Sequence, residues 1–486
     1  MNDISLYVAL AILIPALVGC ICFLLPKRNF VRDGVTILGA ISHIFVMSQL
    51  YSAVISGAVP KLHVLKIFPG ANISFAVEPL GLLFGGLVSI LWLISSVYAI
   101  GYMRASNEDR LHIFFGFFAI AISATVALAF SDNLIALFVF YEVLTFSTYP
   151  LVSHRRDSDA RDGARKYITI LLSTSVLFFL PAIVWTYGLS GTVEFKVGGI
   201  IPSDTSVSTL LILAFLFLYG VGKAAVMPVH RWLPSAMVAP APVSALLHAV
   251  AVVKAGVFTI LKIIIFVFGV DSFKSFGGST YFVYISGITV IVASVIALGH
   301  DNLKSRLAYS TISQLSYVVL AASLATPLAI IGACMHIIAH AFLKITLFFA
   351  AGSIYLSAHK IKISDLDGIG KRMPFTMLAF AIGALGMIGI PPTAGFLGKW
   401  FILSSVMSSQ DYFVIFVIFV STLLNTSYFV PVIYNSFAKS EQKIPTDDHG
   451  ESPFMVVLPL SITALASLLI FLFPALPLSL IKLVIG

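Results

Sequence analysis

Long apolar stretches dominate the chain, and short segments rich in Gly, Pro and charged residues separate them. A helix needs about 20 residues to cross the roughly 30 Å hydrocarbon core of a bilayer, and most of these stretches are that long. Apolarity and polar punctuation together predict about fourteen transmembrane helices. They cover residues 4–25, 34–58, 79–103, 111–130, 133–153, 167–188, 207–228, 241–268, 280–299, 306–324, 327–356, 375–408, 412–436 and 453–475. We therefore expect an all-α integral membrane protein with a single membrane domain over residues 1–486.

Prolines interrupt two of the predicted helices. Pro391 and Pro392 lie in the middle of the twelfth helix, which is too long for one straight span. Pro228 and Pro234 similarly interrupt the end of the seventh helix. A broken helix is tolerated in a bilayer only where its freed backbone groups face protein or a water-filled cavity. The breaks in helices 7 and 12 therefore indicate an ion path.

Composition supports the membrane assignment, because 59% of the residues are hydrophobic and only 10% are charged. The mean hydropathy is +1.03, whereas a soluble domain carries about 25% charged residues. The net charge of +8 does not indicate a nucleic-acid partner. The basic residues are spread over short loops and form no stripe with stacking aromatic residues. We expect the chain to lie in the lipid bilayer and to bind no nucleic acid.

The three cysteines, Cys20, Cys22 and Cys334, lie inside apolar stretches and supply no four-ligand set for zinc or an iron–sulfur cluster. We expect inert thiols, no bound metal and no cofactor. The first apolar stretch follows Asp3, has no basic segment before it and ends without a small-residue cleavage site. It therefore predicts a first transmembrane helix and not a signal peptide.

Basic residues are distributed unequally between the two sets of predicted loops. Loops after odd-numbered helices hold nineteen: Lys27, Arg28, Arg32, Arg104, Arg110, Arg155, Arg156, Arg161, Arg165, Lys166, Arg231, Lys304, Arg306, Lys360, Lys362, Lys371, Arg372, Lys439 and Lys443. Loops after even-numbered helices hold five: Lys61, Lys66, Lys196, Lys274 and Lys482. The positive-inside rule then places the odd loops in the cytoplasm and both termini outside.

The remaining basic residues lie inside predicted helices: Lys223, Lys254, Lys262, Lys344 and Lys399. Glu142 is the one acidic residue well inside a predicted helix, while Glu78 and Asp132 lie at helix edges. A charge at the bilayer centre costs about 3 kcal/mol or more, so such residues face the bundle interior and mark ion routes. Lys262 lies near a helix end, where a long side chain can also reach the interface.

Lys223 directly precedes the break in helix 7. Its surroundings resemble a phosphate-binding loop only superficially, because Phe217 replaces the first glycine and Ala224 replaces the Ser or Thr. A desolvated lysine can gain and lose a proton near neutral pH when a neighbouring charge changes. Glu142 is its natural partner, and weakening their ion pair would release a proton. A static buried pair that only fixes packing is the alternative.

Further titratable residues lie in helices 8 and 11. His248 and Lys254 are six residues apart, which places them about 120° and about 9 Å apart on one helix, so they cannot touch directly. His336, His340 and Lys344 follow one another at intervals of four residues and share one helical face. A packing pair or a metal site is the alternative, but a metal needs more ligands than these. The pattern favours a proton relay.

Lys399 follows the double proline of helix 12, so each half of the chain offers a buried lysine near a broken helix. Five helices is an odd number, so two consecutive five-helix units would insert with opposite topology, as in many transporters. We expect three N-terminal helices in 1–110, one unit in 111–268, a second in 280–436 and a last helix in 453–475.

Together these features resemble the antiporter-like subunits shared by respiratory complex I, membrane-bound hydrogenases and multisubunit Mrp cation/proton antiporters. The resemblance covers essentially the entire chain. The segments that carry it are Glu142, Gly222-Lys223, Pro228 to Pro234, Val243 to His248, Asp301 to Ser310, His336, His340 and Gly395 to Lys399. It implies a Glu/Lys pair in helices 5 and 7, a Lys or His in helix 8 and a Lys or Glu in helix 12, joined by a hydrated axis. Glu142, Lys223, His248, Lys254 and Lys399 occupy those positions.

Within that family, the length resembles the D-type Mrp subunit or the compact complex I subunits, and Lys399 resembles the D-type Mrp and large complex I subunits. The stretch Ser244 to His248 looks closer to the large complex I and hydrogenase subunits. The resemblance implies an ion-translocating subunit of a multisubunit Na⁺ or K⁺/H⁺ antiporter in a bacterial or archaeal inner membrane, with other membrane subunits as partners. A proton-pumping subunit of an NADH-quinone oxidoreductase or hydrogenase is the alternative, and a stand-alone permease is a third. The chain carries no dinucleotide fingerprint, flavin site or cluster ligands, so redox catalysis would fall to partner subunits.

Overall fold

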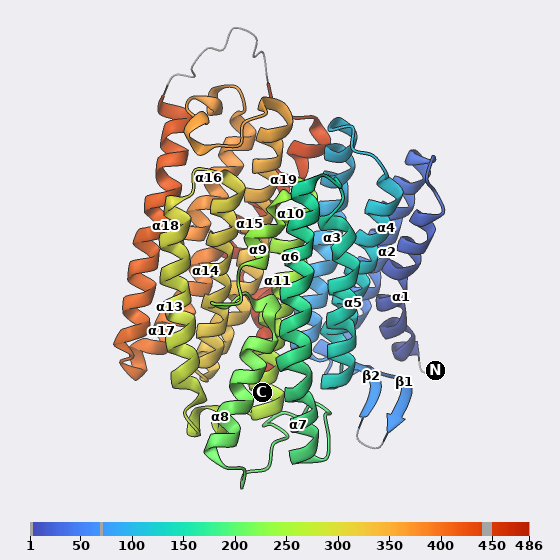
Figure 1. Ribbon diagram of the computed structural model, residues 1–486, viewed down its shortest axis with the longest axis vertical. Coiled ribbons are helices and arrows are strands. Elements are labelled where there is room, and N and C mark those ends of the chain that lie inside the picture. Colours follow the sequence, from blue (N-terminus) through green and yellow to red (C-terminus); the bar gives the residue numbers. More distant parts are fainter. Residues whose placement is uncertain (1–2, 69–70, 440–449, 486) are drawn as a thin grey trace.

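The computed structural model describes residues 3–68, 71–439 and 450–485, and it is a bundle of long helices that run roughly side by side (Figure 1). Lys443, which we assigned to a basic loop, lies outside the described residues. Among those residues, eleven helices are long and apolar enough to cross a membrane, and several shorter apolar helices accompany them. The predicted all-α membrane protein with about fourteen spans is confirmed.

The N-terminal part consists of α1 (Asp3–Phe23), α2 (Asn29–Ile55), β1 (Lys61–Phe68), β2 (Ala71–Ala76) and α3 (Pro79–Ala105). It is followed by α4 (Leu111–Phe130), α5 (Leu134–Val152), α6 (Ser158–Thr174), α7 (Leu180–Ser190), α8 (Val207–Gly220), α9 (Trp232–Ser235), α10 (Ala241–Ala245) and α11 (Val252–Ile263). The last part consists of α12 (Val270–Ser275), α13 (Gly278–Gly299), α14 (Leu303–Ser323), α15 (Pro327–Ala358), α16 (Pro374–Ile388), α17 (Ala394–Ser409), α18 (Tyr412–Ala438), α19 (Phe454–Leu472) and α20 (Ala475–Ile485).

Both expected helix breaks are present, but the first begins earlier than the prolines predict, because α8 ends at Gly220 and Lys223 therefore lies within the break and not before it. After α8, the chain forms a 3₁₀ turn, Gly222–Ala224, before the short helix α9. After α16, Gly389 adopts a φ of +94°, a left-handed conformation that favours glycine, and α17 begins only after the two prolines. Each unit proposed from the sequence, 111–268 and 280–436, thus contains one broken helix. The inverted relation of the two units and the division at their ends stay predictions.

Several basic residues assigned to loops lie in helices instead. The helix predicted to begin at 167 begins at Ser158, because the Asp157 side chain accepts a hydrogen bond from the backbone N–H of Ala160 at 2.7 Å. Its first turns therefore contain Arg161, Arg165 and Lys166. Asn302 caps α14 in the same way, and Lys304 and Arg306 are inside that helix. Charged first turns lower the hydropathy of a segment, so apolarity alone places the helix start too late.

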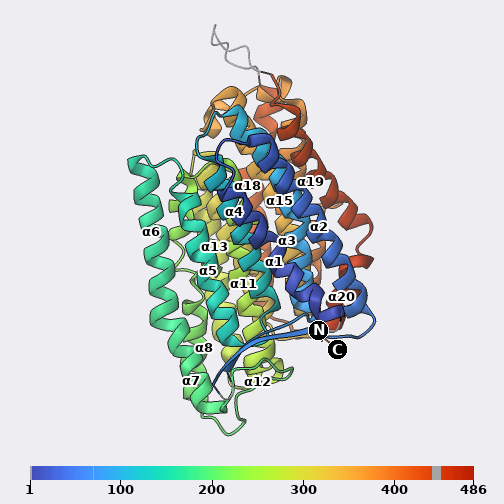
Figure 2. The ribbon, with the colours of Figure 1, turned by 90° about the vertical axis from the view of Figure 1, so that its right-hand side faces the viewer.

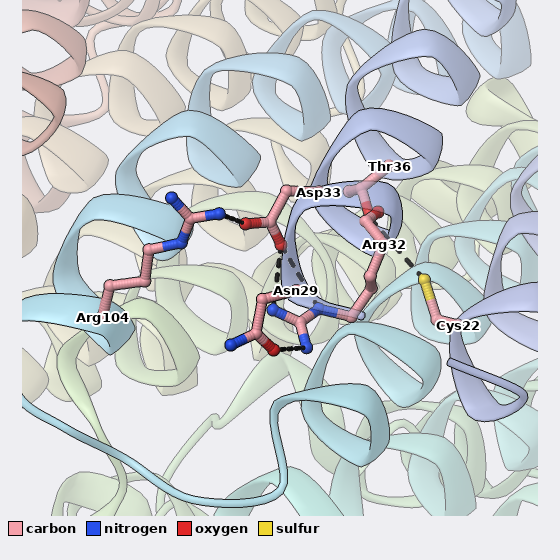
Figure 3. A network of polar contacts seen from close by, with 6 residues as sticks. All are labelled: Cys22, Asn29, Arg32, Asp33, Thr36 and Arg104. Carbon is pink, nitrogen blue, oxygen red and sulfur yellow. Dashed lines mark hydrogen bonds and ion pairs between the residues drawn. The ribbon is translucent and has the colours of Figure 1, made fainter. Parts of the chain in front are cut away.

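Arg32 and Arg104 show the same effect at the ends of α2 and α3. Asp33 forms ion pairs with both arginines and so ties the two helices together (Figure 3). Arg32 also donates to Asn29 at 2.8 Å and lies 5.1 Å from the centre of the Phe115 ring. The pairing lets a buried arginine keep its charge at the end of a membrane helix.

One end of the bundle carries two features that hydropathy did not predict. The strands β1 and β2 form an antiparallel hairpin, on which Lys61 and Lys66 lie. The short helix α20 follows α19 and packs against α3 and α15. The two views place both chain ends at this end of the bundle, as an even number of spans requires (Figures 1 and 2).

Candidate functional site

Lys223 lies in the break after α8 and is completely buried. Its ammonium donates to the backbone carbonyl of Tyr141 at 2.8 Å and to Thr145 Oγ1 at 2.5 Å. The same ammonium lies 3.2 Å from the centre of the Tyr141 ring, a close cation–π contact. The 3₁₀ turn therefore presents Lys223 to α5, where two oxygens and an aromatic face replace its water.

Glu142 lies on α5 beside these groups but does not form the expected direct ion pair with Lys223. Neither Glu142 carboxylate oxygen accepts a hydrogen bond from the residues that the structure describes. Tyr141 and Glu142 are adjacent on a helix, so their side chains leave it about 100° apart. Because Lys223 faces Tyr141 and Thr145, its ammonium makes no hydrogen bond with the Glu142 carboxylate.

The middle of the bundle contains a second lysine, Lys254, on α11. Its ammonium is in direct contact with Nδ1 of His340 on α15, and both side chains are buried. His336 lies one helical turn from His340, with 6.3 Å between the ring centres. The sequence did not show that α11 would bring a lysine against the histidine face of α15.

Lys344 and His248 complete this central group. Lys344 lies one turn beyond His340 on α15 and donates to Ser310 Oγ on α14 at 2.7 Å. His248 lies in a π-helical turn, Leu246–Val250, and its ring centre is 4.6 Å from that of Phe348. Neither His248 ring nitrogen has a hydrogen-bond partner among the described residues. Turns of this kind are frequent at functional sites, because they widen the helix and re-aim a side chain.

Lys399 lies near the start of α17, after the break in helix 12. Its ammonium donates to the backbone carbonyls of Met387 and Ile388 at 3.2 Å and 2.8 Å. These carbonyls belong to the last turn of α16, where helical carbonyls lack partners and carry partial negative charge. The break thus creates the cation-binding position that Lys399 fills.

Tyr317 on α14 connects Lys399 to the histidines. Its ring centre is 5.3 Å from the Lys399 ammonium and 5.6 Å from the His336 ring centre. Gly398 is on α17, next to Lys399. A Cβ at Gly398 would overlap His336 of α15, so this glycine lets the two helices approach closely. Sequence reasoning missed Tyr317 and the hydroxyl of Thr145, because uncharged residues in apolar helices give no signal of their own. It named Ser310 only as part of the segment Asp301 to Ser310 and gave it no role.

Lys223 is joined to the centre through the backbone. A Cβ at Gly256 would overlap the backbone of Lys223 and Ala224, so the break in helix 7 packs directly on α11. Gly256 is two residues from Lys254. The seven lysines and histidines of the expected site are therefore buried along a path from the first helix break, across α11 and α15, to the second, while Glu142 is half-buried on α5.

The profile of a transmembrane family described as NADH:quinone oxidoreductase/Mrp antiporter matches residues 131–425. The chain belongs to this family. The matched segment contains all eight residues of the site: Glu142, Lys223, His248, Lys254, His336, His340, Lys344 and Lys399. The family resemblance of the sequence is thereby confirmed.

Relatives of the chain include proteins named as oxidoreductase subunits and a protein named as an antiporter subunit. The N subunit of NADH-quinone oxidoreductase from Desulforudis audaxviator is 29% identical over 449 residues, which is 86% of each chain. A probable K⁺/H⁺ antiporter subunit from Rhizobium meliloti is 30% identical over 444 residues. That alignment covers 88% of this chain but only 43% of the Rhizobium protein.

Solved structures share the fold at lower identity. A chain of the Mrp complex from Dietzia superimposes with a TM-score of 0.88 at 20% identity, covering 100% of this chain and 97% of that one. A chain of an archaeal membrane-bound sulfane sulfur reductase gives a TM-score of 0.85 at 22% identity, with 98% and 96% covered. The protein is therefore an antiporter-like, multi-pass membrane subunit of this family.

Proposed function

We propose that the chain is an ion-translocating subunit of a multisubunit Na⁺ or K⁺/H⁺ antiporter and moves protons along its buried titratable group. The observation that carries this proposal is the sequence of neighbouring side chains Lys399, Tyr317, His336, His340 and Lys254. A charge in a membrane interior is costly and is kept for function by default. Five groups that can carry or pass a proton, at close spacing between a helix break and the bundle centre, form a route.

The contact between Lys254 and His340 is the best-defined step of this route. An ammonium beside an unprotonated ring nitrogen can pass it a proton, and the imidazole can release another from its second nitrogen toward His336. Lys344, one turn away, bears a like charge when protonated, so the two lysines disfavour each other's charged form. A proton that arrives at one group therefore promotes release at the next.

Glu142 and Lys223 form the other end of the proposed route. Lys223 is held by a carbonyl and a hydroxyl of α5, which favour its charged form, and Glu142 adds a negative charge on the same helix. A change in the charge of Glu142 then alters the proton affinity of Lys223 without any movement of the backbone. This coupling supplies the switch that a one-directional relay needs.

The proposed setting is a bacterial or archaeal cell membrane, in a complex with other membrane subunits. The named relatives are subunits of larger assemblies, and the compared structures are chains of multisubunit membrane complexes. A second candidate is the proton-pumping arm of an oxidoreductase. It is favoured by the alignment to the quinone oxidoreductase subunit, which spans 86% of both chains.

Inverted membrane vesicles that contain the chain with its native partner subunits distinguish the two functions. After an acid interior is established, addition of NaCl or KCl should release protons, as followed with a pH-sensitive dye. Vesicles that carry Lys399→Ala should not respond. A proton flux that requires an electron donor and a quinone, and ignores both cations, would instead support the oxidoreductase arm.

A further inference from the structure

Lys262 is the one buried lysine of the predicted helices that the proposed route does not use. It lies at the end of α11, and its side chain is 1% exposed. Its ammonium is 2.7 Å from Glu78 Oε1 and donates to the Ser131 carbonyl at 2.6 Å. It therefore binds to oxygens from two other parts of the chain. Its place near a helix end had suggested that the side chain could extend to the interface, but the ammonium is buried.

These surroundings are those of a bound monovalent cation. Besides the carboxylate and the carbonyl, the ring of Phe195 lies 4.6 Å from the ammonium and that of Phe258 lies 5.7 Å away. Backbone carbonyls and carboxylates are the ligands by which proteins replace the water of Na⁺ and K⁺, and aromatic faces attract cations as well. The lysine ammonium thus occupies a position built for a small positive ion.

A cavity of about 230 Å³ adjoins this position. Its lining includes Lys262, Glu78 and Asp132, and Asp132 is 3.5 Å from the exposed Lys61. The rim includes Val59 and Val197, which are 52% and 77% exposed, so the cavity opens at the surface. Water occupies about 30 Å³ per molecule in the liquid, so the volume admits a cation with part of its hydration shell.

The two carboxylates and two lysines balance one another when all four are charged. Glu78 precedes α3, and Asp132 lies between α4 and α5. Lys61 begins β1, and Lys262 lies in the last turn of α11. If Lys262 loses its proton, one negative charge is left without a buried partner, and an unpaired buried charge is strongly unfavourable. A free cation beside Glu78 restores the balance.

We propose that this cavity is a monovalent-cation site in which the Lys262 ammonium and a Na⁺ or K⁺ ion alternate. The inference rests on the proposed antiport function and names its cation site, which we call the mouth site (Glu78, Ser131, Asp132 and Lys262). In the exchange, the ammonium gives one proton to bulk water, the neutral amine moves aside, and one cation binds to Glu78 and Ser131. One positive charge leaves as another enters, so the net charge of the site is unchanged.

The mouth site is connected to the proposed proton route through α11. Lys262 follows Lys254 by eight residues, which corresponds to about 12 Å along a helix. Residues 254 and 262 are both on this helix, and all of its residues are buried. A proton released at Lys254 and a cation bound at Lys262 therefore act on the same helix, within a distance at which charges interact in a protein interior.

The test uses the full-length protein in lipid nanodiscs and sodium as the probe. Equilibrium binding of radioactive sodium is measured against a choline background at a series of pH values, and proton release is followed with a dye in weak buffer. We expect sodium to release protons, and sodium affinity to fall by up to about tenfold for each unit that the pH is lowered. Radioactive rubidium, as a substitute for K⁺, is measured in the same way. Cation binding without proton release, or no binding of either cation at alkaline pH, would overturn the proposal without the use of any variant.

Variants locate the site. Lys262→Arg keeps the ion pair but cannot lose its proton, so sodium binding and proton release should both disappear. Lys262→Gln removes the competing ammonium, so sodium binding should become independent of pH and release no proton. Lys274→Gln changes an exposed lysine on α12 and should behave like the wild type. Unchanged sodium exchange in Lys262→Arg would exclude the mouth site.

The outcomes also separate this inference from the proposed function. Lys399→Ala should stop proton flux in vesicles but leave sodium-driven proton release at the mouth site intact. If the wild type shows normal cation-dependent proton flux but no sodium-driven proton release at the mouth site, only the site is refuted. Exchange at the site without any cation-dependent flux would refute only the antiport function.

Discussion

Lys254 of α11 and His340 of α15 are in direct contact at the centre of the bundle, although 86 residues separate them in the chain. Both are buried, and each belongs to a different part of the matched family segment. The contact joins a lysine of α11, the helix on which the first helix break packs, to the histidines that lead to the second break. Its disruption is therefore the most direct test of the relay.

We expect His340→Gln to fold normally but to reduce proton flux by about a hundredfold or more, the usual contribution of a positioned acid–base group. The amide oxygen of Gln can still accept from Lys254 but cannot take up a proton and pass it on. The exposed His359 provides a matched control, and His359→Gln should transport normally. Flux in vesicles at equal protein abundance is the measurement, and unimpaired His340→Gln would show that the contact only fixes packing.

Variants at Lys399 should separate titration from fixed charge. Lys399→Arg keeps a positive charge against the Met387 and Ile388 carbonyls but does not release its proton, so flux should be nearly absent. Lys399→Glu can titrate, and the family resemblance implies that Glu serves at this position, so more activity should remain. Lys399→Ala should be inactive. If Arg supports wild-type flux in vesicles, Lys399 is only an electrostatic element.

Glu142→Gln should abolish proton flux and leave the protein assembled. The substitution removes the charge that acts on Lys223 but nearly keeps the side-chain volume. Because the carboxylate accepts no hydrogen bond from the described residues, little packing is lost. Size-exclusion profiles and vesicle flux give the two measurements. Normal flux would mean that the carbonyl and hydroxyl of α5 alone set the protonation of Lys223.

Gly256→Ala tests the close packing of the helix 7 break on α11. The added Cβ would overlap the Lys223 backbone, so the variant should be destabilised by about 1–3 kcal/mol, the usual cost of overpacking. Gly188 on α7 has no atoms within 4 Å of its Cβ position, so Gly188→Ala should not be destabilised and can gain up to about 1 kcal/mol from the higher helix propensity of Ala. Denaturant unfolding in detergent compares the two, and equal stability would show that the break yields easily.

The charge asymmetry of the loops predicts that the segment with Arg155 and Arg156 faces the cytoplasm and that both termini face outside. Single cysteines placed at Arg156 and at the C-terminus, in a cysteine-free background, should react oppositely with an impermeant reagent in intact cells. The C-terminal position should be labelled without permeabilisation and the loop position only after it. The reverse pattern would invert the topology.

The sequence by itself determined the membrane class, the approximate number of spans and the two helix breaks. The spans follow from the length of apolar stretches, and the second break follows from the double proline, both of which act locally. The first break begins after Gly220, upstream of Pro228, so proline indicated its existence but not its start. It also identified the eight titratable positions, because charge in an apolar helix is visible without any structure. The helix starts predicted at 167 and 306 were too late, because capping side chains start these helices at Ser158 and Leu303 despite the low local hydropathy.

Only the tertiary structure decided which of these groups meet. Lys254 contacts His340, Lys223 faces Tyr141 and not Glu142, and Lys262 reaches Glu78, in each case across different helices or loops. Helical periodicity fixes the face of a side chain within one helix but not the neighbour that covers this face. That neighbour depends on close approaches at Gly256 and Gly398, and these arise from the packing of the whole bundle.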